Sequence, residues 1–99
     1  MKIINNFRVK VKSREVMGDY IALHGLVPQN ELPEHLRLKI PDNEIWMRRD
    51  IYDNKRERNK VLQHEECELT LMTNKDMTYK EAHAVATLAE ETKDFSVCK

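Results

Sequence analysis

Three residues near the middle of the chain have types and a spacing that could hold a metal ion and use it. The stretch VLQHEECELTLM, residues 61–72, contains His64, Glu65 and Glu68 in the pattern H-E-x-x-E. If this stretch is a helix, His64 and Glu68 lie one turn apart on one face, where both can bind the same ion. Glu65 stands beside them, where the zinc motif H-E-x-x-H keeps its general base. A glutamate replaces the second histidine of that motif, so another histidine must complete the ligand set.

The histidine that could complete the set is His83, in the downstream segment YKEAHAVATLAEE. With His64 and Glu68 it gives two imidazoles and one carboxylate, the ligand composition of catalytic zinc sites of the thermolysin kind. Three protein ligands leave a fourth position for water, whose pKa zinc lowers to about 7. Glu65 would take a proton from that water and pass it to a leaving amine. The sequence therefore predicts one Zn²⁺ per chain, held by His64, Glu68 and His83.

These residue types also have ordinary structural interpretations. His64 and Glu68 could be a surface ion pair on a helix, which contributes about 0.2–0.5 kcal/mol. His83 could be a helix histidine with its hydrogen bonds satisfied. Cys67 lies three residues from His64 and could reach the same metal, although a small buried side chain is its commoner role. His24 is expected at the C-terminal end of a helix, where the helix dipole favours a cation.

Size and composition limit the classes of protein that need to be considered. Ninety-nine residues, of which 40% are hydrophobic and 34% charged, predict a single domain, 1–99, with one modest core. The formal net charge is zero, so no overall field draws the chain to nucleic acid or to an anionic membrane. No apolar run approaches the roughly 20 residues that cross a bilayer. The N-terminal stretch has no signal-peptide pattern, so we expect a cytoplasmic location with Cys67 and Cys98 reduced.

The elements that precede the motif are predicted from periodicity and turn residues. Residues 2–12 end in an alternation typical of a half-buried strand. Ser13 is a candidate N-cap for a helix over residues 14–26. Residues 34–40 alternate Leu and Ile with polar residues, which favours a short strand or an extended segment. Residues 44–51 predict a second strand without a clean apolar face, which indicates an edge or the border of a groove.

Two helices should carry the candidate ligands. Asn54 is the expected cap of the helix that contains the motif, and Thr78 with Glu81 forms a capping box for the last helix. Small residues on the last helix would let the two helices approach closely as antiparallel neighbours. The C-terminal residues 92–99 are expected to fray. The predicted fold is α+β, with a small antiparallel or mixed sheet packed on about three helices.

From Asn43 to about Glu90, the chain resembles small zincin-like proteins, a group of predicted metallopeptidases in archaea, bacteria and their viruses. The resembling features are the strand EIWMRRDI, the charged lead-in, HEECELTLM and the YKEAH segment. The resemblance implies a minimal gluzincin-type domain with its core at 43–90, and residues 1–42 lie outside it. It also implies that the strand around Trp46 is a groove wall that pairs an extended peptide. Tyr79 is the candidate transition-state donor, although packing at the helix start is its plainer role.

The leading functional hypothesis is a zinc-dependent peptidase-like protein with Glu65 as the catalytic base and a peptide or protein as substrate or partner. A second hypothesis keeps the zincin scaffold as a catalytically silent interaction module, in which the metal is a structural staple or absent. A third is a small nucleic-acid-binding regulator that uses the basic cluster Lys55, Arg56, Arg58 and Lys60. Nucleic acid is the less favoured partner, because neither interleaved aromatic residues nor a glycine-rich loop accompanies that cluster.

Overall fold

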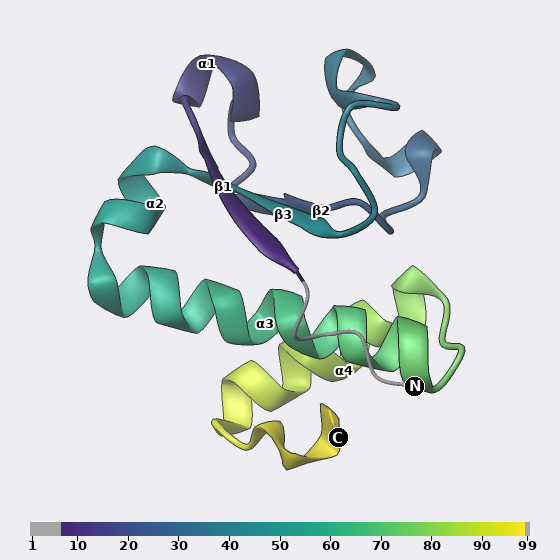
Figure 1. The fold of residues 1–99 in the computed structure, drawn as a ribbon. Coiled ribbons are helices and arrows are strands. Elements are labelled where there is room, and N and C mark those ends of the chain that lie inside the picture. Colours follow the sequence, from purple (N-terminus) through teal and green to yellow (C-terminus); the bar gives the residue numbers. More distant parts are fainter. Residues whose placement is uncertain (1–6, 99) are drawn as a thin grey trace.

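The computed structural model describes residues 7–98 and shows a small sheet lying against a helical hairpin (Figure 1). The strands are β1 (Arg8–Lys12), β2 (Ala22–His24) and β3 (Glu44–Arg48), in the order β1-β3-β2. β1 pairs with β3 in parallel and β2 pairs with β3 antiparallel. The sheet is therefore mixed, and the predicted α+β class is confirmed.

Four α-helices complete the described chain: α1 (Arg14–Met17), α2 (Arg49–Asp53), α3 (Lys55–Asn74) and α4 (Tyr79–Thr92). The chain also contains short 3-10 helices, namely η2 (Gln29–Glu31) and η3 (Glu34–Leu36) between β2 and β3, and η4 (Phe95–Cys98) after α4. Figure 1 shows the sheet on one side of α3 and α4 on the other. Helix α3 is thus the middle layer, and it buries polar as well as apolar residues.

The two long helices begin where their capping residues predict. The Asn54 side chain accepts the backbone N–H of Glu57 at 3.1 Å and caps α3. At α4, the Thr78 hydroxyl accepts the Glu81 N–H at 3.1 Å, and the Glu81 carboxylate accepts the Thr78 N–H at 3.0 Å. The small-residue face of α4 packs on α3 with Ala82, Ala86 and Ala89 buried. This close packing brings the side chains of the two helices together.

The helix predicted over residues 14–26 is wrong beyond its first turn. Gly18 has φ +63°, a left-handed conformation that stops α1 after Met17. Residues Ala22–His24 instead pair with β3, where the Arg48 N–H donates to the Ile21 carbonyl at 2.9 Å. Sheet pairing with a strand over 20 residues away overrides the local helical preference. His24 therefore lies on a strand and is fully buried, not at a helix terminus.

The strand predicted over residues 34–40 is also wrong. This segment contains the η3 turn, and it buries Leu36 and Ile40 while leaving Leu38 88% exposed. A strand would place all three on one face. The buried residues Leu32, Leu36 and Ile40 are four apart in the sequence. The turns of this segment therefore bring every fourth residue to the core, whereas a strand would bring every second one.

The strand predicted over residues 44–51 forms, but it is shorter and it is not at an edge. β3 ends at Arg48, where α2 begins, and both its sides are occupied by β1 and β2. The N-terminal strand forms as β1 from Arg8, and the first residues of its predicted range lie outside the described part of the chain. The prediction that this strand lies at an edge of the sheet is therefore wrong. Its neighbours β1 and β2 come from segments far from it in sequence, so the residues of β3 alone do not reveal them.

The C-terminal segment is ordered by packing and by a disulfide. η4 packs on α3 and α4, and Cys98 forms a disulfide with Cys67, with a Cα–Cα distance of 5.1 Å. The predictions of frayed residues 92–99 and of reduced cysteines are therefore wrong for the described residues up to Cys98. The turn after α4 directs the chain back across α3, which sequence spacing alone does not reveal. Among residues 7–98, no helix is long and apolar enough to cross a lipid bilayer.

Candidate metal centre

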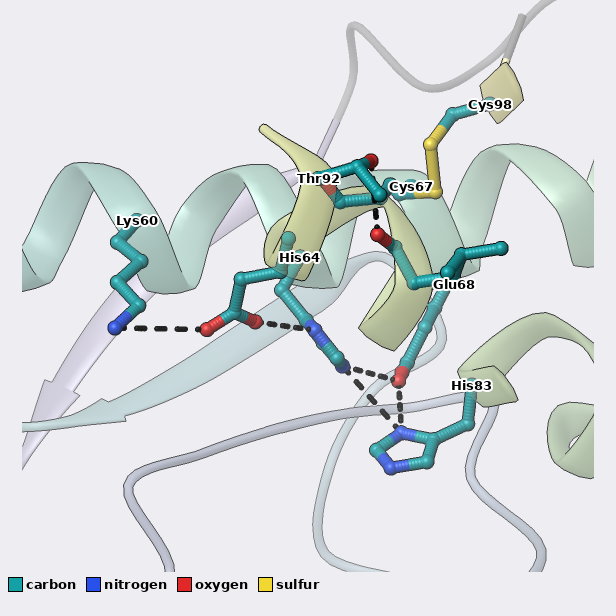
Figure 2. A network of polar contacts seen from close by, with 10 residues as sticks. Lys60, His64, Cys67, Glu68, His83, Thr92 and Cys98 are labelled. Atoms are coloured by element: carbon teal, nitrogen blue, oxygen red, sulfur yellow. Dashed lines mark hydrogen bonds and ion pairs between the residues drawn. A yellow bond between two sulfur atoms is a disulfide. The ribbon is translucent and has the colours of Figure 1, made fainter. Parts of the chain in front are cut away.

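The three predicted ligands converge between α3 and α4 (Figure 2). His64 Nε2 lies 2.8 Å from Glu68 Oε2 within α3. From α4, His83 Nδ1 lies 2.5 Å from the same oxygen and 3.4 Å from His64 Nε2. The i,i+4 spacing on α3 and the antiparallel hairpin together produce this arrangement. The structure therefore brings together the His64, Glu68 and His83 set that the sequence predicts.

The three atoms lie close enough together for one ion to contact all of them, because each is within 3.4 Å of the other two. Two imidazole nitrogens and one carboxylate oxygen are also ligands that zinc prefers.

Glu68 is the centre of the cluster and is 1% exposed. Its second oxygen, Oε1, lies 2.9 Å from Nε2 of His24 at the end of β2. Burial alone would raise the pKa of Glu68, but hydrogen bonds from His24, His64 and His83 lower that pKa to about 2. Glu68 is thus held as a carboxylate, the form that binds a metal. Sequence reasoning missed His24 here because it placed that residue on a helix.

His64 is held from its other side by Glu90 on α4. His64 Nδ1 lies 2.9 Å from Glu90 Oε1, and Lys60 Nζ lies 3.7 Å from Glu90 Oε2. Burial lowers the pKa of His64, but contacts with Glu68, Glu65 and Glu90 outweigh it and raise that pKa to about 9. Glu90 was also missed, although it follows His83 by seven residues on the helix face that returns along α3.

Glu65 lies on the side of α3 that faces a cleft of about 670 Å³, whose lining includes His64, Glu65, Tyr79 and His83. It is 8% exposed. Burial, followed by the nearby charge of Glu68, raises the pKa of Glu65 to about 8. A largely buried carboxyl with a raised pKa, beside a possible metal position, has the environment expected of an acid or base.

The two predicted groove residues have different positions. Tyr79 lines the cleft, with its ring centroid 5.6 Å from that of His83. Burial and the charges of Glu68 and Glu65 raise the pKa of Tyr79, so its hydroxyl keeps a proton to donate. Trp46 is instead 9% exposed in the core of the sheet, and its Nε1–H donates to Glu44 at 2.9 Å.

The prediction that the strand around Trp46 pairs an extended peptide is therefore wrong, because both sides of β3 are occupied. The wall of the cleft opposite α3 is made by β2 and the residues before it, including Tyr20, Ile21 and Ala22. These residues belong to the part of the chain outside the zincin-like resemblance. Only the pairing of β2 with β3 reveals that they border the site.

Cys67 and the basic cluster contribute little to this site. Cys67 packs among the buried alanines of α4 and is bonded to Cys98, so its sulfur is not available as a metal ligand (Figure 2). In the basic cluster, Arg58 lies 4.9 Å above the Tyr52 ring. Lys60 approaches Glu90. Two of the four cations are thus engaged within the protein.

Comparison with protein-family models, with curated proteins and with solved structures finds no match to this chain. The zincin-like resemblance therefore stays a prediction, and the function must be inferred from the geometry of the site.

Proposed function

We propose that this protein is a zinc-dependent peptidase-like domain. The observation that carries the proposal is the convergence of His64 Nε2, Glu68 Oε2 and His83 Nδ1 within 3.4 Å of one another. Glu65, which is 8% exposed, lines the cleft next to them. When bound there, zinc would supply a Lewis acid that polarises a peptide carbonyl and acidifies water.

The chain's own residues would divide the remaining work. A cation bound beside Glu65 would lower its pKa, and the carboxylate would then accept a proton from water in the cleft and deliver it to the leaving amine. Tyr79, whose raised pKa keeps it neutral, would donate a hydrogen bond to the oxygen that becomes negative. Removing one such donor from a comparable site costs about 10²–10³ in kcat.

The substrate would lie along β2. In an antiparallel ladder, alternate residues direct their backbone groups to the partner strand. Ile21 and Gly25 bond to β3, so Ala22 directs its N–H and C=O to the other side. Ala22 also lines the cleft, and an extended peptide could add there as a further strand.

A catalytically silent scaffold is the second candidate, and one observation favours it. His64 lies between the carboxylates of Glu68 and Glu90, and its raised pKa of about 9 favours a cation there near neutral pH. With a proton on each ring nitrogen, His64 can thus donate hydrogen bonds to Glu68 and Glu90 without a metal. The nucleic-acid hypothesis has less support, because Arg58 and Lys60 already have internal partners.

The location also stays a prediction. A cytoplasmic protein would keep Cys67 and Cys98 as thiols, whereas an oxidising compartment would preserve their disulfide. Thiol labelling of protein taken directly from its native source, with and without prior reduction, distinguishes the two.

Metal analysis and peptide cleavage test the proposed function. We expect about one equivalent of zinc in the wild type and none in the double variant His64→Ala, His83→Ala. His35→Ala is the matched control, because His35 contacts the Val16 carbonyl away from the site. Absence of zinc from the wild type after incubation with zinc would refute the metal centre.

Catalysis requires a separate variant. Glu65→Gln should keep zinc but lose cleavage of a mixed peptide library, whereas the exposed neighbour variant Glu66→Gln should keep both. Zinc binding without cleavage by the wild type would favour the silent scaffold.

A further inference from the structure

Two groups of possible metal ligands share Glu68. One is His64, Glu68 and His83, and the other is His24, Glu65 and Glu68, all three of which are buried. The two oxygens of Glu68 face different groups, since Oε1 faces His24 and Oε2 faces His64 and His83. A carboxylate in this position could bridge two ions. Whether the centre binds one ion or two therefore depends on what His24 can offer.

The backbone fixes which nitrogen of His24 carries a proton. The N–H of Leu26 donates to Nδ1 of His24 at 3.1 Å, so that nitrogen presents its lone pair. A neutral imidazole has one N–H, which must then be on Nε2. Nε2 lies 2.9 Å from Glu68 Oε1, so it donates a proton to the carboxylate and has no lone pair for a metal.

The surroundings of His24 hold this orientation. The side chain is fully buried, and the Tyr79 ring approaches its edge with 5.8 Å between ring centroids. The turn that follows is closed by the Val27 N–H donating to the His24 carbonyl at 3.3 Å. A side chain at Gly25 would collide with the Pro41 carbonyl, which packs against this turn. Rotation of the imidazole would therefore break two hydrogen bonds without opening a new one to solvent.

We propose that His24 is a positioning residue that makes the centre mononuclear. By donating to Oε1, it reserves Oε2 of Glu68 for one ion shared with His64 and His83. It also keeps the second group from binding metal, so Glu65 stays free to act as a base. The inference rests on the proposed function, and it adds a role for a residue of the N-terminal segment.

This role also joins the two walls of the cleft. His24 belongs to the sheet, whereas Glu68 belongs to α3, so their hydrogen bond fixes a ligand of the helical hairpin to the opposite wall. Partners that orient metal ligands typically contribute 10–100-fold to metal affinity. We expect His24 to act at this level.

The first test is the tautomer of His24, measured by ¹⁵N NMR of the imidazole in zinc-free and zinc-loaded protein. We expect a proton on Nε2 and none on Nδ1 in both states. A proton on Nδ1 in the zinc-free protein would refute the inference. Direct coordination of zinc by His24, or two equivalents of tightly bound zinc, would also refute it.

The second test compares zinc dissociation constants. His24→Phe removes the donor and should weaken zinc binding 10–100-fold. His24→Gln keeps an N–H donor and should recover part of the loss, and His35→Gln should have no effect. Circular dichroism checks that each variant is folded. Equal zinc affinity in folded His24→Phe and wild type would show that His24 does not position Glu68.

The two tests separate the inference from the proposed function. Failure of the wild type to bind zinc would refute the proposed metal centre and, with it, the role of His24 toward metal. The zinc-free tautomer would still report whether His24 donates to Glu68.

Discussion

Glu90 holds His64 by the ring nitrogen that faces away from Glu68, with 2.9 Å between Nδ1 and the Glu90 oxygen. A carboxylate at this position favours the proton on Nδ1 and directs Nε2 to the metal position. Histidine ligands of protein metal sites commonly have such a partner. The arrangement links the end of α4 to the centre of α3, because His83 and Glu90 contact the cluster from two points along one helix.

Replacement of Glu90 should therefore weaken metal binding without abolishing it. We expect Glu90→Gln to raise the zinc dissociation constant about 10-fold or more, because the amide supports the His64 tautomer less strongly than a carboxylate. Isothermal titration with zinc measures the change. Glu91→Gln is the control, since Glu91 is an exposed neighbour. Equal affinities of Glu90→Gln and wild type would show that Glu90 does not support the ligand.

Without metal, the protein should lose stability as the pH rises from about 6.5 to 9. The pKa of His64 is raised from 6.5 to about 9, so its contribution is complete below pH 6.5 and is lost as pH passes 9. Glu65 acts in the same direction, because its pKa is raised from 4.5 to about 8. Urea unfolding of metal-free protein across this range should show a falling midpoint, and His64→Gln should flatten the profile. A midpoint that rises with pH would contradict both pKa shifts.

Zinc should stabilise the protein more strongly as the pH rises. Zinc binding requires the unprotonated nitrogen of His64, so the apparent affinity should increase as the pH rises across the same window. Thermal unfolding with and without excess zinc should therefore show a stabilisation by zinc that is larger at pH 8 than at pH 6. Equal stabilisation at both pH values would indicate that zinc does not replace a proton on His64.

Loss of the disulfide should destabilise the helical hairpin. Cys67 and Cys98 are 31 residues apart, and the loop-entropy relation gives about 3–4 kcal/mol for a loop of this length. The free energy of unfolding should fall by this order when a dithiol reduces the wild type. The double variant Cys67→Ala, Cys98→Ala should not respond to the dithiol. A response of the double variant would mean that the reductant acts elsewhere.

Gly25 should tolerate no larger residue. An added Cβ would lie 2.0 Å from the Pro41 carbonyl oxygen, and the nearest atoms there are backbone. Gly25→Ala should therefore cost about 2 kcal/mol or more in the free energy of unfolding, as overpacked sites do. Gly18→Ala is the comparison, because Gly18 has open space and any cost there comes from its φ of +63° and not from a collision. Similar stabilities of Gly25→Ala and wild type would show that the loop at Pro41 can move.

The sequence by itself determined the local features of this protein. The starts of α3 and α4 follow from Asn54 and Thr78, because a side-chain cap satisfies backbone groups within four residues of itself. The pairing of His64 with Glu68 follows from helical spacing alone. His83 could be selected because the short link after α3 requires an antiparallel return.

Only the tertiary structure decided the features that depend on distant segments. Residues Ala22–His24 have a local pattern compatible with a helix. They form a strand because they pair with the side of β3 that β1 does not occupy. That pairing places His24 on Glu68, across 44 residues of sequence, and moves the candidate peptide-binding edge from β3 to β2. The return of the chain after α4 similarly brings Cys98 to Cys67. Caps and helical spacing act over a few residues, whereas sheet order and disulfide pairing depend on the packing of the whole chain.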